Sequence, residues 1–363
     1  FVGRASELAV LDAALADVVE GRPAVVHVEG GSGIGKTELV ERFVAKLDAR
    51  PGAIVLRGRC HPQESVSYNG FDGIVDELSE WMSKLDTSEL ADVLPADAEA
   101  LQAIFPMFGR IAAIAADPDE PRADAYELRR RSFRALRELL SKMAERHTVA
   151  VVLDDVQWGG ADTAALVADV FRPPYSPRVL LVLAYRSEEE ERSTMLAELR
   201  RRAGILFDSV HRIALGPLDR TESCELAMQL LGKNDRAAQR IAEHIATETG
   251  GHPLFLRELA LAVAVSEGPP SDAGRGPADG AMSGQATADL GALLARRIAE
   301  LPETERAILE LASVATRPLP RRVLFAAAGR DGHPVSEVVR LARKRLLRET
   351  ASGGEPAVEP FHS

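Results

Sequence analysis

The sequence predicts an α/β protein in which helices sandwich a parallel sheet, followed by a helical lid and a winged-helix-like domain. Apolar segments of strand length lie at residues 24–29, 53–59, 148–155 and 178–186. Segments with helical periodicity lie between them, and strands that alternate with helices form a parallel sheet covered on both faces. After Gly216 the periodicity becomes purely helical, which marks the end of the sheet domain.

The periodicity and composition divide the chain into four regions. We expect a phosphate-binding sheet domain over 1–215, a helical lid over 216–266, a flexible linker over 267–289 and a winged-helix-like domain over 290–363. The linker is rich in Gly, Pro, Ser, Asp and Ala and has few large apolar side chains. Short helical segments followed by a hairpin over 346–361 indicate the winged helix. Helices are expected at 71–85, 124–147, 163–171, 221–232, 235–249, 254–266, 290–300, 303–315, 320–328 and 335–347.

A glycine-rich segment from Gly30 to Thr37 follows the first strand, opens a helical pattern and matches G-x-x-x-x-G-K-[ST]. Backbone N–H groups of such a loop close around phosphates, and the helix N-terminus adds a partial positive charge. Lys36 would reach the β- and γ-phosphates, and Thr37 would place its hydroxyl on Mg²⁺. The alternative is a glycine-rich turn without a ligand. The predicted nucleotide-binding residues of this segment are Gly30, Gly31, Ser32, Gly33, Ile34, Gly35, Lys36, Thr37 and Glu38.

Charged residues end two of the other predicted strands. Asp154 and Asp155 close the third strand, where the ligand sites of parallel sheets lie. Asp154 would bind Mg²⁺, and Asp155 would polarise the attacking water, unless the two carboxylates merely end a strand. Arg186 closes the fourth strand, and a cation there needs an anion, either the γ-phosphate or a neighbouring Glu188 or Glu189. Together with Lys36, these three residues are the predicted catalytic set for a phosphate-transfer site.

Composition excludes several classes of protein. The net charge of −11 argues against nucleic-acid binding by bulk electrostatics. The two cysteines, Cys60 and Cys224, are far apart, which fits a reducing compartment and a cytoplasmic protein. The apolar runs are shorter than a membrane span needs. Because the chain begins at Phe1, we expect it to be a piece of a longer polypeptide.

The motifs occur in an order that resembles the STAND class of signal-transduction ATPases, within the AAA+ superfamily. Its closest resemblance is to the ATPase regions of bacterial proteins fused to serine/threonine kinases or adenylyl cyclases, and of maltose-regulator-type activators. The kinase-fused branch is favoured by residues 57–60, 67–68 and 184–189. The resemblance covers residues 1–265 well and 290–363 loosely. The ordered motifs are Val2-Gly3-Arg4, Gly30–Thr37, Val151–Trp158, Arg186 and Gly251-His252-Pro253.

The resemblance implies an ATP/ADP- and Mg²⁺-dependent regulatory switch with slow hydrolysis and self-association on activation, joined to further domains. Val2, Gly3 and Arg4 would contact the adenine, and Pro253 would pack on the base, although this turn could also simply join two helices. Gly159 and Gly160 depart from the expected pattern and put any role for Asp162 in doubt. An arginine finger is not evident, since Arg200, Arg201 and Arg202 resemble a solvated face.

Two alternatives to the switch remain open at this point. One is a DNA-binding transcription activator that uses the basic segment 340–348, where a winged helix would place its recognition helix. The other is a nucleotide-locked scaffold with little turnover. We expect DNA contact to be the less favoured of these readings, because winged helices in this class more often serve as interdomain contacts.

Overall fold

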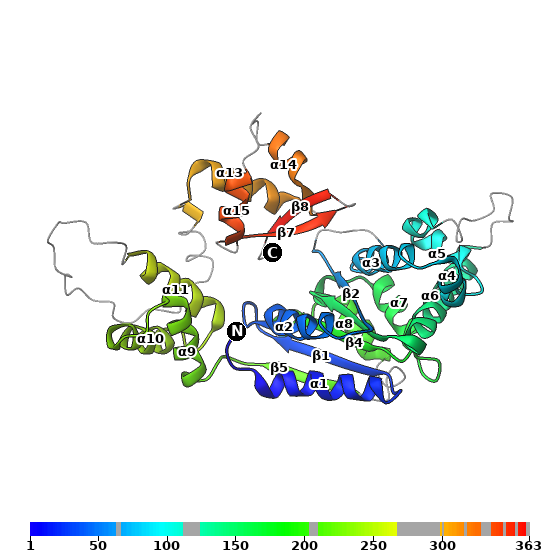
Figure 1. Cartoon of the computed structure of the whole chain (residues 1–363), viewed down its shortest axis with the longest axis horizontal. Coiled ribbons are helices and arrows are strands. Elements are labelled where there is room, and N and C mark those ends of the chain that lie inside the picture. Colours follow the sequence, from blue (N-terminus) through cyan, green and yellow to red (C-terminus); the bar gives the residue numbers. More distant parts are fainter. Residues whose placement is uncertain are drawn as a thin grey trace. The chain divides into compact units, whose positions relative to one another are not determined.

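The chain forms two compact units, Phe1–Val263 and Ala264–Ser363, each described by itself below (Figure 1). Among the described helices, none combines the length and the apolar character that a membrane crossing needs. The computed structural model describes residues 1–62, 67–111, 124–202, 210–266, 298–299, 301–315, 318–327, 335–343, 346–352 and 355–360.

A five-stranded sheet in the order β2-β3-β4-β1-β5 forms the centre of the first unit. Its strands are β1 (Ala24–Gly30), β2 (Ala53–Arg59), β3 (Thr148–Asp154), β4 (Leu180–Arg186) and β5 (Val210–Leu215). Every pair of neighbours is parallel, so all the carboxyl ends lie at one edge of the sheet. The predicted α/β fold with a parallel sheet is therefore confirmed.

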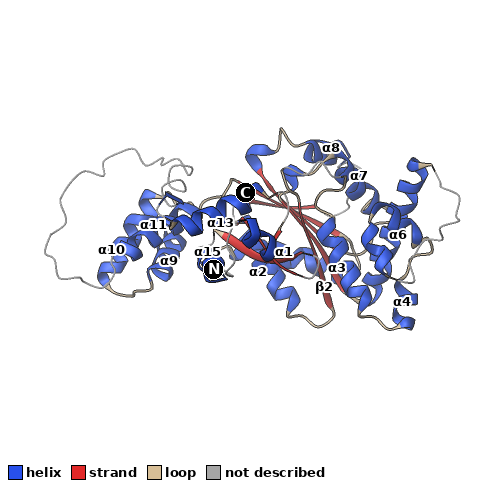
Figure 2. Cartoon of the chain, turned by 90° about the horizontal axis from the view of Figure 1, so that it is seen from above, coloured by secondary structure: helices blue, strands red, loops and turns tan. Residues whose placement is uncertain are grey.

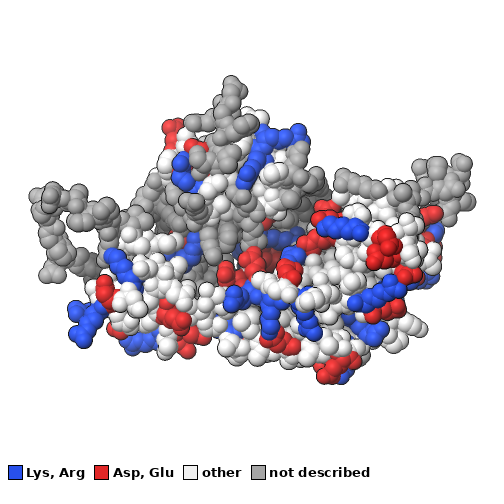
Figure 3. All heavy atoms as spheres, in the orientation of Figure 1, with Lys and Arg blue, Asp and Glu red and all other residues white. Residues whose placement is uncertain are grey.

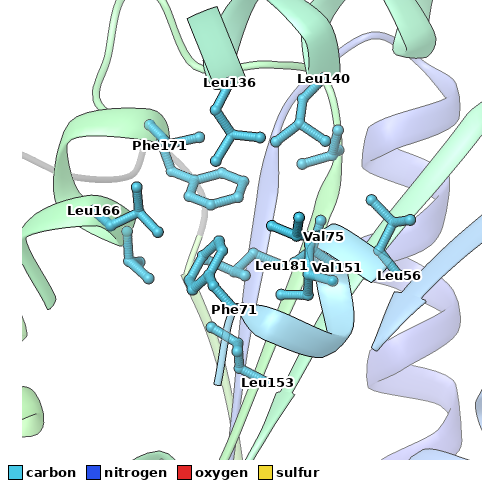
Figure 4. Packing of buried hydrophobic residues seen from close by; sticks show 14 of the residues in the cluster. Leu56, Phe71, Val75, Leu136, Leu140, Val151, Leu153, Leu166, Phe171 and Leu181 are labelled. Carbon is cyan, nitrogen blue, oxygen red and sulfur yellow. The ribbon is translucent and has the colours of Figure 1, made fainter. Parts of the chain in front are cut away.

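Helices cover both faces of this sheet (Figure 2). One face packs against α1 (Ala5–Val19) and α2 (Lys36–Asp48), with Val26 and Phe43 in the shared core. The other face carries a larger core, part of which Figure 4 shows around Phe71 and Phe171. Alternate strand residues enter opposite cores, as the period of a strand requires. The helices on this second face are α3 (Asp72–Ser83), α6 (Ala125–Arg146), α7 (Ala161–Val170) and α8 (Thr194–Arg202), with the short α4 (Thr87–Val93), α5 (Glu99–Ile104) and η1 (Pro106–Arg110) beside them.

Three helices follow the sheet within the same unit, as the sequence predicts. They are α9 (Arg220–Leu231), α10 (Arg236–Glu248) and α11 (Pro253–Ser266). Asp219 caps α9 in a capping box with Glu222, and Asp235 caps α10, so each helix has a side-chain acceptor for N–H groups of its first turn. A small apolar core that includes Leu256 holds the three helices together.

The second unit contains α13 (Glu303–Val314), α14 (Arg321–Ala327) and α15 (Val335–Arg343) with a three-stranded antiparallel sheet. The sheet order is β6-β8-β7, from β6 (Leu319–Pro320), β7 (Leu347–Ser352) and β8 (Glu355–Pro360). Strands β7 and β8 pair from Ser352 and Glu355 onward, so the predicted hairpin is present. The predicted linker 267–289 and most of the predicted helix 290–300 lie outside the described residues. The assignment of this unit as winged-helix-like stays a prediction.

The structure corrects three element predictions. Strand β5 was not predicted. It is an edge strand, and its buried residues alternate with exposed ones, so no continuous apolar run marks it. Helix α7 begins at Ala161 rather than Thr163, with Gly160 at its N-cap, so Asp162 lies in the first turn, beside Arg129.

The predicted basic helix over 340–348 is also shorter than expected. Helix α15 ends at Arg343, and Leu347 already belongs to β7, where burial of this residue in the small core favours the strand. The guanidinium of Arg340 bonds the carboxylates of Glu305 and Glu337. Charged side chains of both signs are interspersed on the described surface shown in Figure 3.

Candidate nucleotide-binding site

The predicted site residues of three strands meet at the carboxyl edge of the sheet. In the strand register, Gly30 at the end of β1 pairs with Arg186 at the end of β4. Arg59 at the end of β2 likewise pairs with Asp154 at the end of β3. The glycine-rich loop leaves β1 at this edge and enters α2 at Lys36. The edge therefore brings an anion-binding loop, two carboxylates and two arginines together.

The loop adopts the backbone that its glycines permit. Gly33 and Gly35 have φ values of 71° and 99°. Residues with a Cβ rarely adopt this region, whereas glycine adopts it readily. A Cβ on Gly30 would lie 2.8 Å from the carbonyl oxygen of Leu215 in β5, so this glycine is needed for close packing against the sheet. Gly31, in contrast, has open space around it apart from Glu188.

Lys36 lies folded back over the loop. Its ammonium group donates to the carbonyl oxygens of Gly30 and Gly31, both at 2.8 Å, and the side chain is buried. Burial, together with the nearby guanidinium of Arg186, lowers the pKa of Lys36. A buried cation of this kind, held at the mouth of the loop, is well placed to meet phosphate oxygens.

Thr37 and Asp154 join the start of α2 to the end of β3. The Thr37 hydroxyl donates to Asp154 Oδ2 at 3.0 Å, and the backbone N–H of Asp155 donates to Asp154 Oδ1 at 2.8 Å. Burial, followed by the charge of Asp155, raises the pKa of Asp154. A hydroxyl and a carboxylate at this distance are the hard oxygen donors that Mg²⁺ takes, with the remaining positions left to water and phosphate. These two residues fit the predicted Mg²⁺ site. Among the described residues no cluster of three His, Cys, Asp or Glu side chains forms a complete protein-only metal site.

Asp155 is the centre of a buried polar network. Its Oδ2 accepts from Arg59 Nε at 2.8 Å, its Oδ1 accepts from Gln157 Nε2 at 2.8 Å, and Arg186 Nε lies 4.0 Å from Oδ1. Burial alone would raise the pKa of Asp155, but Arg59 and the hydrogen bonds bring it below its usual value. Asp155 has a φ of 53°, in the left-handed region that Asp adopts more readily than most residues other than glycine. This backbone turn brings both neighbouring carboxylates into the site.

Arg186 faces this network. Its backbone N–H donates to Gln157 Oε1 at 3.1 Å, and its guanidinium lies 6.0 Å from the centre of the Trp158 ring. Gln157 thus links Asp155 and Arg186 through the nitrogen and the oxygen of its side-chain amide. The three predicted catalytic residues beyond Lys36 are therefore brought together, and Arg59 and Gln157 join them without having been predicted.

The N-terminal segment also reaches the loop. The guanidinium of Arg4 donates to the carbonyl oxygen of Ile34 at 3.4 Å and to that of Gly216 at 2.5 Å. The backbone N–H of Arg4 donates to Glu222 Oε1 at 3.3 Å. Gly3 has a φ of 69°, and a Cβ there would collide with the Glu222 carboxylate. The predicted segment Val2-Gly3-Arg4 therefore lies between the loop and α9.

The turn before α11 contacts the loop from the helical side. His252 Nε2 lies 3.0 Å from the carbonyl oxygen of Ser32, to which it donates, and burial lowers the pKa of this imidazole. A Cβ on Gly33 would lie 2.8 Å from Leu254 Cδ2. Pro253, between these two contacts, begins α11. The predicted lid residue is thus part of a turn that packs directly on the glycine-rich loop.

Glu188 is expected from the sequence only as an alternative anionic partner of Arg186, and the structure gives it a different contact. It lies in the turn η3 (Ser187–Glu189) after β4, and its Oε1 accepts the backbone N–H of Ser32 at 2.8 Å. The signal in the sequence was the acidic pair after a strand end. Its contact depends on the pairing of β4 with β1, which the sequence does not reveal.

Comparisons with known proteins bear on this arrangement. Residues 1–182 match the model of the AAA ATPase domain family. No curated protein matches the chain. The structure resembles a STAND protein with a tetratricopeptide repeat sensor from Pyrococcus horikoshii, with a TM-score of 0.54 and 15% identity over 99% of this chain. The chain covers 41% of that protein.

A second solved structure is more distant. It is a Walker-type ATPase of Pyrococcus abyssi, with a TM-score of 0.41, 14% identity and coverage of 100% of this chain and 94% of that one. The family match spans half of this chain. The glycine-rich loop and the β3 carboxylates of this chain lie where the sequence predicts them. The chain therefore belongs to the AAA ATPase domain family, and its likeness to the STAND protein shows a shared fold.

Proposed function

We propose that this chain is the ATP-binding, slowly hydrolysing switch module of a larger signalling protein. The observation that carries the proposal is the hydrogen bond of 3.0 Å between the Thr37 hydroxyl and Asp154, which joins the phosphate-binding loop to the third strand. Thr37 follows the buried Lys36 in α2, and the charge of Asp154 acts on the Lys36 ammonium. Such a set of groups serves phosphoryl transfer from a nucleoside triphosphate to water.

Each residue has a proposed task at this site. The loop amides and Lys36 hold the phosphates, and Thr37 and Asp154 hold Mg²⁺, which when bound neutralises charge on the phosphates. Asp155 has a lowered pKa and is a weak base, so it orients and polarises the attacking water by accepting a hydrogen bond. Arg186 offsets the negative charge that develops on the terminal phosphate.

The helical lid would respond to the nucleotide through its contacts with the loop. Val2, Gly3, Arg4 and Pro253 are proposed to surround the adenine, since the N-terminal segment and the turn before α11 both reach the loop. A nucleotide changes the equilibrium between two lid positions only through contacts that differ between them. The hydrogen bond from His252 to Ser32 is one contact of this kind.

The wider role is a further part of the proposal. We propose that ADP favours a closed arrangement and that ATP, with a signal sensed elsewhere, permits self-association. Fusion to a serine/threonine kinase or a similar output domain in a cytoplasmic protein is proposed on the sequence resemblance alone. Slow turnover is expected, because the product of such a switch is a conformation rather than a metabolite.

The experiment is an ATP hydrolysis assay on wild type and the Asp154→Asn variant, with Asp162→Asn as control. The Asp162 side chain is 49% exposed, is paired with Arg129 and has no proposed role in the site. We expect slow hydrolysis in wild type and in Asp162→Asn, and at least about a hundredfold loss in Asp154→Asn, because one metal-holding carboxylate is gone. Equal rates in all three proteins would contradict the proposal. ATP binding without measurable hydrolysis in wild type would favour the nucleotide-locked scaffold.

A further inference from the structure

The phosphate-binding loop already holds a carboxylate of this chain. Glu188 Oε1 accepts the Ser32 backbone N–H at 2.8 Å, and Glu188 Oε2 lies at van der Waals distance, 4.0 Å, from where a Cβ on Gly31 would be. The residues are 156 positions apart in the chain, and the register of β1 with β4 brings them together. The hydroxyl of Ser187 also donates to Glu188 Oε2 at 3.4 Å.

The groups around Glu188 keep its carboxylate ionised. Partial burial would raise the pKa of Glu188, but its own backbone N–H, the Ser32 N–H and the charges of Lys36 and Arg186 lower it overall. The loop is therefore bound to an internal anion through one of the amides that such loops use for phosphate. A single N–H makes one short, linear hydrogen bond, so a phosphate oxygen and this carboxylate exclude one another there.

The position of the contact indicates which phosphate is affected. The Gly31 carbonyl, in the same peptide unit as the Ser32 N–H, accepts from the ammonium of Lys36. The lysine of such a loop reaches the β- and γ-phosphates, whereas the helix start faces the phosphates nearer the nucleoside. Ser32 lies four residues before the helix start at Lys36, on the strand side of the loop, so its amide would meet the terminal phosphate.

We propose that Glu188 is a specificity-determining residue that selectively weakens ATP binding, because the terminal phosphate must displace its carboxylate from the Ser32 amide. This inference rests on the proposed function, since it concerns the same nucleotide site. It adds a residue to that site and predicts an intrinsic preference for ADP. A switch with this residue would keep its diphosphate form until ATP is in excess or a signal moves the turn after β4.

The test is the equilibrium binding of ATP·Mg²⁺ and ADP·Mg²⁺ to wild type, Glu188→Gln, Glu188→Ala and Glu189→Gln, by isothermal titration calorimetry. Glu189 is the matched control because it is the next acid of the same turn. We expect Glu188→Gln to tighten ATP binding about tenfold by removing one like charge at the site, and ADP binding by about threefold or less. The alanine variant should tighten ATP binding at least as much, because glutamine can still accept the Ser32 N–H. The Glu189→Gln variant should match wild type.

The outcomes separate this inference from the proposed function. Wild type that binds ATP and ADP with affinities unchanged in both Glu188 variants would overturn the inference alone. Weaker ATP binding in the variants would also overturn it, and would assign Glu188 to holding the nucleotide instead. A protein in which wild type and all variants bind neither nucleotide would overturn the proposed function and the inference with it. ATP binding that is seen only after Glu188 is replaced would support both.

Discussion

The ion pair between Arg59 and Asp155 offers a direct test of how the carboxyl edge of the sheet is held together. The perturbation is Arg59→Gln, which removes the guanidinium and leaves the carboxylate of Asp155 in place. The Asp155 side chain is 9% exposed and that of Arg59 is 19% exposed, with Arg59 Nη2 2.7 Å from Asp155 Oδ2. The matched control is Arg57→Gln, since Arg57 lies on the same strand and forms exposed pairs with Asp48 and Glu77.

The structure sets the size of the expected effect. Removing one partner of a fully buried ion pair costs about 3–5 kcal/mol, because a charge is left without compensation. Asp155 would keep its bond from Gln157 and the guanidinium of Arg186 at 4.0 Å. Because these contacts remain and the pair is partly exposed, we expect the free energy of unfolding to fall by about 2 kcal/mol, which is below that range. The control should lose at most about 1 kcal/mol, since exposed pairs contribute little.

The assay is urea unfolding followed by circular dichroism, for wild type, Arg59→Gln, Asp155→Asn and the double variant. A double-mutant cycle isolates the pair from the other contacts of each residue, and we expect a coupling energy of about 1 kcal/mol or more. The reasoning would be refuted if Arg59→Gln were no less stable than Arg57→Gln, or if the two substitutions on Arg59 and Asp155 were additive.

The remaining predictions concern the packing of the loop and the effect of pH on stability. Gly30→Ala should lower the free energy of unfolding by about 1–3 kcal/mol, because its Cβ would press on the Leu215 carbonyl. The control Gly31→Ala should change the free energy of unfolding by less than about 0.5 kcal/mol, because the space around Gly31 is open. Equal effects of the two substitutions in urea unfolding would contradict this prediction. Burial lowers the pKa of His27 to about 4, while the unfolded chain gains this proton near pH 6.5, so stability should fall by about 3 kcal/mol as the pH drops from 6.5 to 4. The His27→Gln variant should lose that part of the pH dependence. Urea unfolding of both proteins across this pH range is the test, and coinciding pH profiles would disprove the assignment of the effect to His27.

Much of the fold is readable from the sequence because the buried strands are continuous apolar runs. Strand β3 is apolar from Val149 to Leu153, and both of its faces are buried, so its pattern is unambiguous. Strand β5 alternates exposed and buried residues at the edge of the sheet, and its Val210 is exposed, so no apolar run marks it. Helix limits shifted by a few residues at α7 and α15, where cap and strand signals compete.

The loop and the carboxylates of the site were predictable for a different reason. Their residues are contiguous in the sequence, and the chemistry of phosphate binding demands those types at that spacing. The partners Arg59, Gln157 and Glu188 were not predicted, because the contacts of Arg59 and Glu188, and that of Gln157 with Arg186, depend on which strands become neighbours. Arg59 reaches Asp155 only because β2 pairs with β3, and Glu188 reaches Ser32 only because β4 pairs with β1.

The measurement that tests the central claim most directly is the binding of ATP·Mg²⁺ to wild type and to Lys36→Ala, by isothermal titration calorimetry. We expect saturable binding by wild type and a loss of affinity of about a hundredfold or more in the variant, because the buried ammonium at the loop would no longer meet the phosphates. Wild type and Lys36→Ala proteins that bind ATP equally well, or a wild type that does not bind it, would contradict the claim that this loop is a nucleotide site.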